Sequence, residues 1–144
     1  MNINRYKPKI DKYFYFIWIP LATLLIAGTI LSTISIPALI ILLCTDVLTF
    51  YFMVSSLVAY VELRENTLFI KFGCILKREI PYDKIIDIKK DRRVITYSML
   101  AIKNSLEHID IKYNKYDFVT VSVKDNDKFI KELKSKMNSK TSEI

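Results

Sequence analysis

The pattern of apolar and polar residues divides the chain into two parts that predict different structures. Within residues 13–59 the only charged residue is Asp46, whereas charged residues recur throughout residues 60–144. A membrane-crossing helix needs about 20 apolar residues, so the first segment is long enough for two spans and a tight turn. We therefore predict a transmembrane hairpin, with spans at about 13–33 and 38–59, followed by a soluble domain.

Beyond the apolar segment, apolar residues alternate with polar ones, as is typical of strands with one buried face. Turn signals separate the alternating runs, namely Glu65-Asn66, Gly73 and Asn114-Lys115. The predicted strands lie at about 60–63, 68–72, 76–80, 84–88, 96–102, 108–113 and 119–123. These short, closely spaced strands predict an antiparallel arrangement that forms a bent sheet or a partial barrel.

The apolar period becomes helical after Asp125, which is a candidate N-cap. Phe129, Ile130, Leu133 and Met137 fall on one face of the predicted helix, and lysines occupy the rest. The soluble domain is therefore predicted to cover residues 60–137, and residues 138–144 are expected to form a frayed tail. The predicted fold class is an α+β membrane protein with a two-helix hairpin, an antiparallel β domain and a C-terminal amphipathic helix.

Positive charge predicts how the hairpin is oriented. The chain has a net charge of +7. The basic segment 1–12 contains Arg5, Lys7, Lys9 and Lys12, whereas the turn between the spans contains no Lys or Arg. Because Lys and Arg accumulate on the cytoplasmic side, we predict a multi-pass protein of the cell membrane with both termini cytoplasmic. A signal peptide is the alternative, but its apolar region would be shorter and followed by a cleavage site.

Asp46 is the most unusual residue of the apolar segment, and Thr45 and Thr49 lie beside it in sequence. A charged side chain at mid-membrane costs about 2.5–3.5 kcal/mol on insertion scales, so it usually has a partner or is protonated. One interpretation is a site for an ion, a proton or a peptide. The other is a bond between helices, made to Thr23, to Thr29 or to a second copy of the chain.

A dense basic group is the main candidate for lipid contact in the soluble domain. A basic patch near anionic lipid gains about 1 kcal/mol per Lys or Arg. Acidic residues interrupt the group, which argues against a nucleic-acid surface. A solvated loop that follows the positive-inside bias is the alternative. The candidate lipid-contact residues are Lys89, Lys90, Arg92 and Arg93, with Lys71, Lys77, Arg78 and Lys84 as neighbours in the sheet.

Reactive side chains are sparse. His108 is the only histidine, and the alternation places it on the exposed face of a strand. Cys44 lies in the second span and Cys74 in a strand turn, so no disulfide is expected. With only two glycines, the chain has no phosphate-binding loop or nucleophile elbow. We therefore expect no enzyme activity, no cofactor and no metal.

Several segments also resemble a known family, the bacterial pleckstrin-homology-like membrane proteins that include the sublancin immunity protein. The matching segments are residues 68–73 (LFIKFG), 80–82 (IPY), 105–113 (SLEHIDIKY) and 121–125 (VSVKD). Family members often have Arg at the position of His108 and Pro at that of Val123. The resemblance covers about residues 60–135 and implies a pleckstrin-homology-like fold. It also implies immunity, in which a producer cell resists its own secreted bacteriocin.

Two functions remain open on the sequence alone. The first is a membrane-anchored binding module that confers bacteriocin immunity by masking a membrane protein or intercepting the peptide. The second is a structural or regulatory membrane protein that binds anionic inner-leaflet lipid or a membrane-protein partner. In either case the hairpin offers a surface for homo-oligomer formation.

Overall fold

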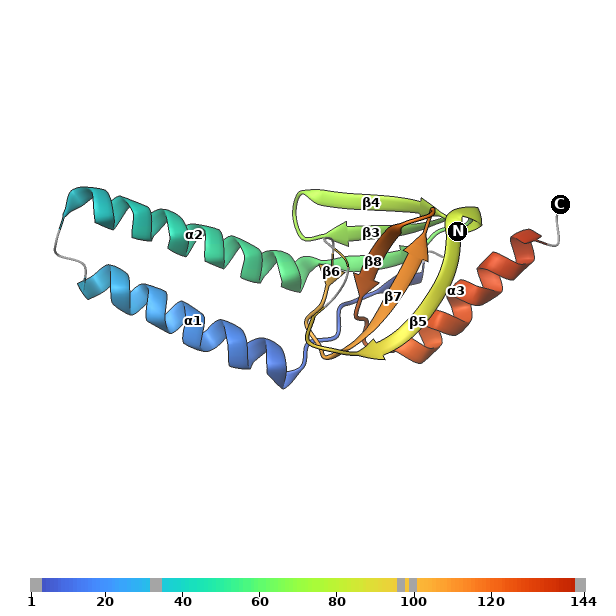
Figure 1. Ribbon diagram of the computed structural model, residues 1–144, viewed down its shortest axis with the longest axis horizontal. Coiled ribbons are helices and arrows are strands. Elements are labelled where there is room, and N and C mark those ends of the chain that lie inside the picture. The colour runs from blue at the N-terminus through green and yellow to red at the C-terminus, as the bar shows by residue number, and fades with distance from the viewer. Residues whose placement is uncertain (1–3, 32–34, 96–97, 99–100, 142–144) are drawn as a thin grey trace.

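The computed structural model describes residues 4–31, 35–95, 98 and 101–141. A pair of long helices projects from one end of a sheet domain (Figure 1). The helices are α1 (Lys12–Leu31), α2 (Ile36–Val58) and α3 (Asn126–Thr141), with a short 3-10 helix η1 (Tyr82–Lys84). The strands are β1 (Asn4–Tyr6), β2 (Tyr60–Leu63), β3 (Thr67–Phe72), β4 (Leu76–Pro81), β5 (Ile85–Arg92), β6 (Ala101–Ile102), β7 (Glu107–Tyr113) and β8 (Asp117–Val121).

Helices α1 and α2 are both long and apolar enough to cross a membrane. Ser35 caps the start of α2, where its Oγ accepts a hydrogen bond from the Ala38 N–H at 3.4 Å. Pro37 lies in the first turn of α2, where its missing N–H costs little. Phe14 is the one buried residue in the described parts of the two helices, so their apolar side chains are available to lipid. Residues 32–34 of the predicted turn lie outside the described residues.

The strands form two four-stranded sheets, ordered β1-β2-β3-β4 and β5-β7-β8-β6. The chain turns sharply where the sequence predicts it, between β2 and β3, at Gly73, and at Asn114 between β7 and β8. One pairing differs from the expected antiparallel arrangement, because β6 runs parallel to β8. The order of elements and the closing helix nonetheless confirm the predicted fold class.

The hydrophobic core lies between the two sheets and is closed by α3. Asp125 caps α3, since its Oδ1 accepts a hydrogen bond from the Lys128 N–H at 3.0 Å. Phe129 and Leu133 are fully buried, which confirms the predicted apolar face of the helix. The buried apolar core comprises Ala59, Val61, Leu63, Leu68, Ile70, Ile80, Tyr82, Ile85, Ile102, Ile109, Ile111, Tyr113, Val119, Val121, Val123, Phe129 and Leu133.

Several predicted boundaries differ from the structure, among them the strand expected at 119–123, which is Asp117–Val121. The strand expected at 84–88 begins at Ile85 and continues to Arg92, because β5 pairs with β7 along that length. Of the strand expected at 96–102, Ala101 and Ile102 form β6, and residues 96–97 and 99–100 lie outside the described residues. Helix α3 continues to Thr141, where the sequence indicates a frayed tail.

The N-terminal segment forms a strand that the sequence analysis did not foresee. Strand β1 adds an edge to the first sheet by pairing with β2. Arg5 donates to the buried carboxylate of Glu62 at 2.8 Å, and its guanidinium lies 4.2 Å from the centre of the Tyr60 ring. The ring of Tyr6 packs edge-on against Phe129, with 5.2 Å between the ring centres. The residues before α1 therefore belong to the sheet domain.

Candidate functional site

Asp46 lies in α2 and binds the neighbouring helix. Thr29 of α1 donates its Oγ1 hydrogen to Asp46 Oδ2 at 2.7 Å. Thr23, the other predicted partner in α1, instead bonds the carbonyl of Ile19 in its own helix, at 2.8 Å. Thr45 likewise donates to its own helix, at the carbonyl of Ile41. The Thr29–Asp46 bond therefore joins the two helices, as hydrogen bonds between polar side chains do in membranes.

The second oxygen of Asp46 has no hydrogen-bond partner within the described residues. Oδ1 is buried, and the residue Asp46 lines a groove of about 310 Å³ between α1 and α2. The groove is lined by Ala22, Leu25, Ile26, Asp46, Val47, Thr49, Phe50 and Met53. Thr49 therefore shares the groove with Asp46, whereas the Thr45 side chain is exposed outside it. A carboxylate oxygen in such a setting favours any ligand that supplies a proton or a hydrogen-bond donor.

The basic group that the sequence singled out lies on β5 and the residue after it, and carboxylates accompany it. Lys90 Nζ lies 2.9 Å from Asp127 at the start of α3, and this bond raises the pKa of Lys90. Bonds from the Arg92 N–H and the Arg93 guanidinium hold the pKa of Asp91 below its usual value. Two further pairs are Lys89 with Asp87 at 3.4 Å, and Arg93 with Asp110 at 3.5 Å. Much of this positive charge is therefore balanced within the domain.

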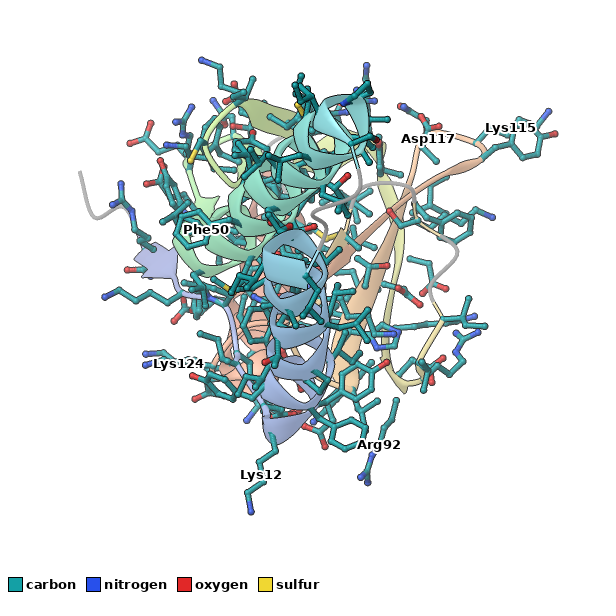
Figure 2. The ribbon with its side chains drawn as sticks, turned by 90° about the vertical axis from the view of Figure 1, so that its left-hand side faces the viewer. Lys12, Phe50, Arg92, Lys115, Asp117 and Lys124 are labelled. Carbon is teal, nitrogen blue, oxygen red and sulfur yellow. The ribbon has the colours of Figure 1, made fainter. Side chains whose placement is uncertain are left out.

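The remaining candidate cations lie on the other sheet, apart from Lys84 in η1. Lys71 of β3 and Lys77 of β4 are directly paired across the hairpin, and Arg78 follows Lys77. Lys71 Nζ lies 5.6 Å from the centre of the Tyr60 ring. Figure 2, viewed along the helices, shows that Lys12, Arg92, Lys115 and Lys124 lie around the outline of the domain. Seven of the eight predicted lipid-contact residues thus form two separate groups, one at β5 and one on the β3–β4 hairpin, and Lys84 lies in η1.

His108 is fully buried, which corrects the prediction of an exposed strand position. Its Nδ1 lies 2.8 Å from the carbonyl of Leu106, and its Nε2 lies 3.6 Å from Asp110. The prediction from alternation assumes that one face of the strand is exposed to solvent, whereas other elements pack against both faces of β7. On the second face, Asp110 accepts a hydrogen bond from Thr120 and is approached by Arg93 from beyond the end of β5.

The two cysteines lie apart, Cys44 in α2 and Cys74 in the β3–β4 turn, and both are free. Among the described residues, no group of three or more His, Cys, Asp and Glu side chains is arranged to hold a metal ion.

A joint between the helices and the sheet domain is the feature that sequence reasoning missed. The buried Asn104 donates its Nδ2 hydrogen to the carbonyl of Ser56 at 2.8 Å, close to the end of α2. The carbonyl of Asn104 accepts from the Asp11 N–H at 3.0 Å, and Ser105 Oγ bonds the Asp11 carboxylate. Asp11 in turn caps α1, since its carbonyl accepts from the Phe14 N–H. Residues 104 and 105 therefore bind the domain-proximal ends of both helices.

The segment between β1 and α1 strengthens this joint. The Lys9 N–H donates to the carbonyl of Ser122 at 3.0 Å, and the Lys124 N–H donates to the carbonyl of Lys7 at 3.1 Å. Lys9 Nζ also lies 2.9 Å from Glu107, and this bond holds the pKa of Glu107 below its usual value of 4.5. The domain is thus bonded to the segment that precedes α1 and to the end of α2.

Comparison with known proteins identifies the sheet domain. Residues 59–137, more than half of the chain, match the family model of the bacterial PH domain. No curated protein and no solved structure matches the chain.

Proposed function

Because this chain belongs to the bacterial PH domain family, we propose that it is a membrane-anchored binding module whose PH domain is held at the inner leaflet. The observation that carries this proposal is the joint at Asn104 and Ser105, which binds α1 through Asp11 and α2 through Ser56. A domain bonded to both helices at one end keeps a fixed distance from the membrane that the helices cross. The basic residues before α1 and the basic domain after α2 support a cytoplasmic location for both.

We propose that the module acts by binding and not by catalysis. The single histidine is buried against Leu106 and Asp110, where no substrate reaches it. The thiols of Cys44 and Cys74 lie in different parts of the fold, without a general base bonded to either. A nucleophile acts through a base within hydrogen-bond reach, and neither cysteine of the described chain has one.

The finer proposal is bacteriocin immunity, with the groove beside Asp46 as the surface that meets a peptide in the membrane. Support comes from the resemblance of residues 105–113 and the neighbouring segments to the family that includes the sublancin immunity protein. The unpartnered Oδ1 of Asp46 supplies an acceptor for a donor on an incoming peptide or on a target membrane protein. A second copy of the chain is the other occupant that fits, and it would make a homo-oligomer through the hairpin.

Survival of a sensitive Gram-positive host tests the immunity proposal. The full chain is expressed in the membrane, and growth is measured against a panel of secreted bacteriocins that includes sublancin. We expect increased tolerance to one peptide, and we expect Asp46→Asn to abolish it, because an amide loses one acceptor and the charge. Asp83→Asn makes the same change at an exposed position of η1 and should leave tolerance intact. Unchanged survival with protein present in the membrane would contradict immunity.

A module that binds anionic lipid or a membrane-protein partner, without immunity, is the second candidate. The adjacent Lys71 and Lys77 favour it, because they lie on the hairpin that approaches α2. The group on β5 supports it less, because the carboxylates of Asp87, Asp91, Asp110 and Asp127 balance its charge. Binding to liposomes with and without anionic lipid separates this candidate from immunity.

A further inference from the structure

The turn between β3 and β4 exposes apolar side chains where a soluble domain normally has polar ones. Ile75 is 73% exposed and Leu76 is 56% exposed, and the exposed Cys74 precedes them. At the opposite end of the domain, the β7–β8 turn has the polar sequence of residues 114–117, NKYD, with Tyr116 as its one aromatic residue. The two hairpin tips therefore differ in polarity, and exposed apolar side chains like those of the β3–β4 tip are typical of an interaction surface.

This apolar tip lies directly beside α2. Gly73 packs so tightly against the helix that an added Cβ would lie 1.6 Å from Ser55 Oγ, and its φ of +72° suits glycine alone. Beside this close contact, a cavity of about 210 Å³ lies between the hairpin and the helix. It is lined by Tyr51, Phe52, Ser55, Ser56, Ala59, Phe72, Gly73, Leu76, Ala101 and Ile102. Figure 1 shows the β3–β4 turn directed toward the helix pair, next to the domain end of α2.

The level of the contact along α2 places the tip at the membrane interface. Helix α2 has 23 residues and is therefore about 34 Å long, whereas the hydrocarbon core is about 30 Å thick. Ser55 lies three residues before Val58, the last residue of the helix, which is about 4.5 Å along the axis. The turn opposite Ser55 therefore lies where the hydrocarbon core meets the headgroups.

The residues around the tip suit that position. Tyr51 and Phe52 lie about one turn of α2 farther from the domain than Ser55 and line the cavity beside the tip, and tyrosine is enriched at membrane interfaces. Lys71 and Lys77 flank the tip on the side of the domain, where their ammonium groups can reach anionic headgroups. From the helices toward the domain, the aromatic residues and the apolar tip therefore come before the cations, and an interfacial segment likewise separates its apolar side chains from its basic ones.

A second exposed apolar pair lies close to the joint. Val94 and Ile95 follow β5, and Ile95 is 80% exposed. Lys103 holds this segment, since its Nζ donates to the carbonyls of Arg93 and Val94. Because Asn104, the next residue, bonds the end of α2, the pair is also tied to the membrane-proximal end of the domain.

We propose that the β3–β4 tip, Cys74–Leu76, inserts into the interfacial region of the inner leaflet, with Val94 and Ile95 as a second contact. The ligand is the lipid surface itself, met by apolar side chains and flanking lysines. This inference rests on the proposed membrane topology and deepens it. The domain then touches the bilayer at points outside the two helices, which fixes its rotation as well as its distance.

The two native cysteines and the single tryptophan allow a direct test with the full chain in vesicles. In a Cys44→Ala background, Cys74 carries an environment-sensitive fluorophore, and the vesicles contain phosphatidylcholine and phosphatidylglycerol with or without a spin-labelled lipid. We expect the spin label to reduce Cys74 emission by roughly half, because a group about 5–10 Å below the surface lies within its reach. Trp18 of α1 should be quenched in the same vesicles, which reports insertion of the hairpin.

The matched control moves the fluorophore to the opposite hairpin tip. Tyr116 is 76% exposed there, and the variant Cys44→Ala, Cys74→Ser, Tyr116→Cys should show no quenching. Ile75→Asp should remove the quenching at Cys74, whereas Ile86→Asp, at an exposed position of β5, should not. Quenched Trp18 with unquenched Cys74 would overturn the inference alone and favour a protein partner at the tip. Unquenched Trp18 and Cys74 would overturn the proposed topology together with the inference.

Discussion

The helix pair and the sheet domain place their apolar side chains in opposite environments. All 17 residues of the apolar core lie at or beyond Ala59, within the PH domain and its α3 helix. In the described parts of α1 and α2, only Phe14 is buried, and most large apolar side chains face outward. The sheet domain therefore supplies its own hydrophobic driving force, whereas the described residues leave the apolar surface of the helix pair uncovered, as suits helices that are long enough to cross a membrane.

Buried polar groups occur in both regions, and their hydrogen bonds differ in part. In the domain, Thr120 donates to Asp110 at 2.5 Å and Ser122 donates to the carbonyl of Glu107 at 2.7 Å, so these buried hydroxyls are satisfied. Between the helices, Asp46 uses one carboxylate oxygen for Thr29 and leaves the other without a partner in the described chain. The domain also has a buried atom without a hydrogen bond in the described chain, Nε2 of His108, but the unpaired carboxylate oxygen lies in the helix pair.

The largest effect that would test this contrast is the loss of a core side chain. Phe129→Ala should destabilise the PH domain by about 3–5 kcal/mol, because the ring fills the core and packs against Tyr6. Leu24→Ala, at a site of α1 that is 71% exposed, should leave urea unfolding of the domain unchanged. Denaturation of the two variants in detergent micelles, followed by circular dichroism, measures both. Similar losses for the two variants would contradict the separation of the regions.

The parts of the fold that the sequence predicts are those with a long, regular pattern. The two apolar helices follow from one long, almost uncharged run and the apolar face of α3 follows from a helical period, and the structure shows both. Strand β1 is only three residues long and lies in a basic segment, so no period marks it. Residues Ala101 and Ile102 of β6 are likewise too few to reveal a parallel pairing with β8.

The candidate sites were harder to predict because their partners are distant in sequence. Asp127 pairs with Lys90 from 37 residues away, so the sequence alone shows a basic group where the structure shows balanced charge. His108 is buried for a similar reason, since side chains from other elements cover its face of β7. Asn104 is a single polar residue with no motif, and only the arrangement of α2 beside it reveals the joint.

A substitution in the joint between the helices and the sheet domain should have an effect of intermediate size. Asn104→Ala removes the donor that satisfies the Ser56 carbonyl, and leaving such a buried group unpaired costs about 1–3 kcal/mol. We expect faster hydrogen exchange at residues 11–14 and 56–60 with little change in the core strands. Asn104→Asp should increase exchange at the same residues as Asn104→Ala, because aspartate keeps the shape of asparagine but lacks the amide donor. The control is Asn66→Ala, in the exposed β2–β3 turn. We expect this variant to change hydrogen exchange within that turn only.

The smallest expected effect is a pH dependence of the segment before α1. Lys9 holds the pKa of Glu107 below its ordinary value of 4.5, so folding favours the ionised carboxylate. A lowered carboxylate pKa contributes stability that is fully present above the unfolded value and is lost as the pH falls through the folded one. Between pH 6 and 8 the Lys9–Glu107 contact should therefore be constant, and below about pH 4.5 it should weaken.

Hydrogen exchange at residues 7–9, measured across this acid range, reports that loss. Glu107→Gln should show the weakened contact at every pH and so flatten the profile, whereas Glu65→Gln in the exposed β2–β3 turn should retain it. Lys90 also lowers the pKa of Asp127, at the start of α3. The Lys90–Asp127 contact should therefore also weaken as the pH falls. An acid-insensitive segment in the unaltered chain would mean that the backbone bonds to Ser122 and Lys124 hold it without the ion pair.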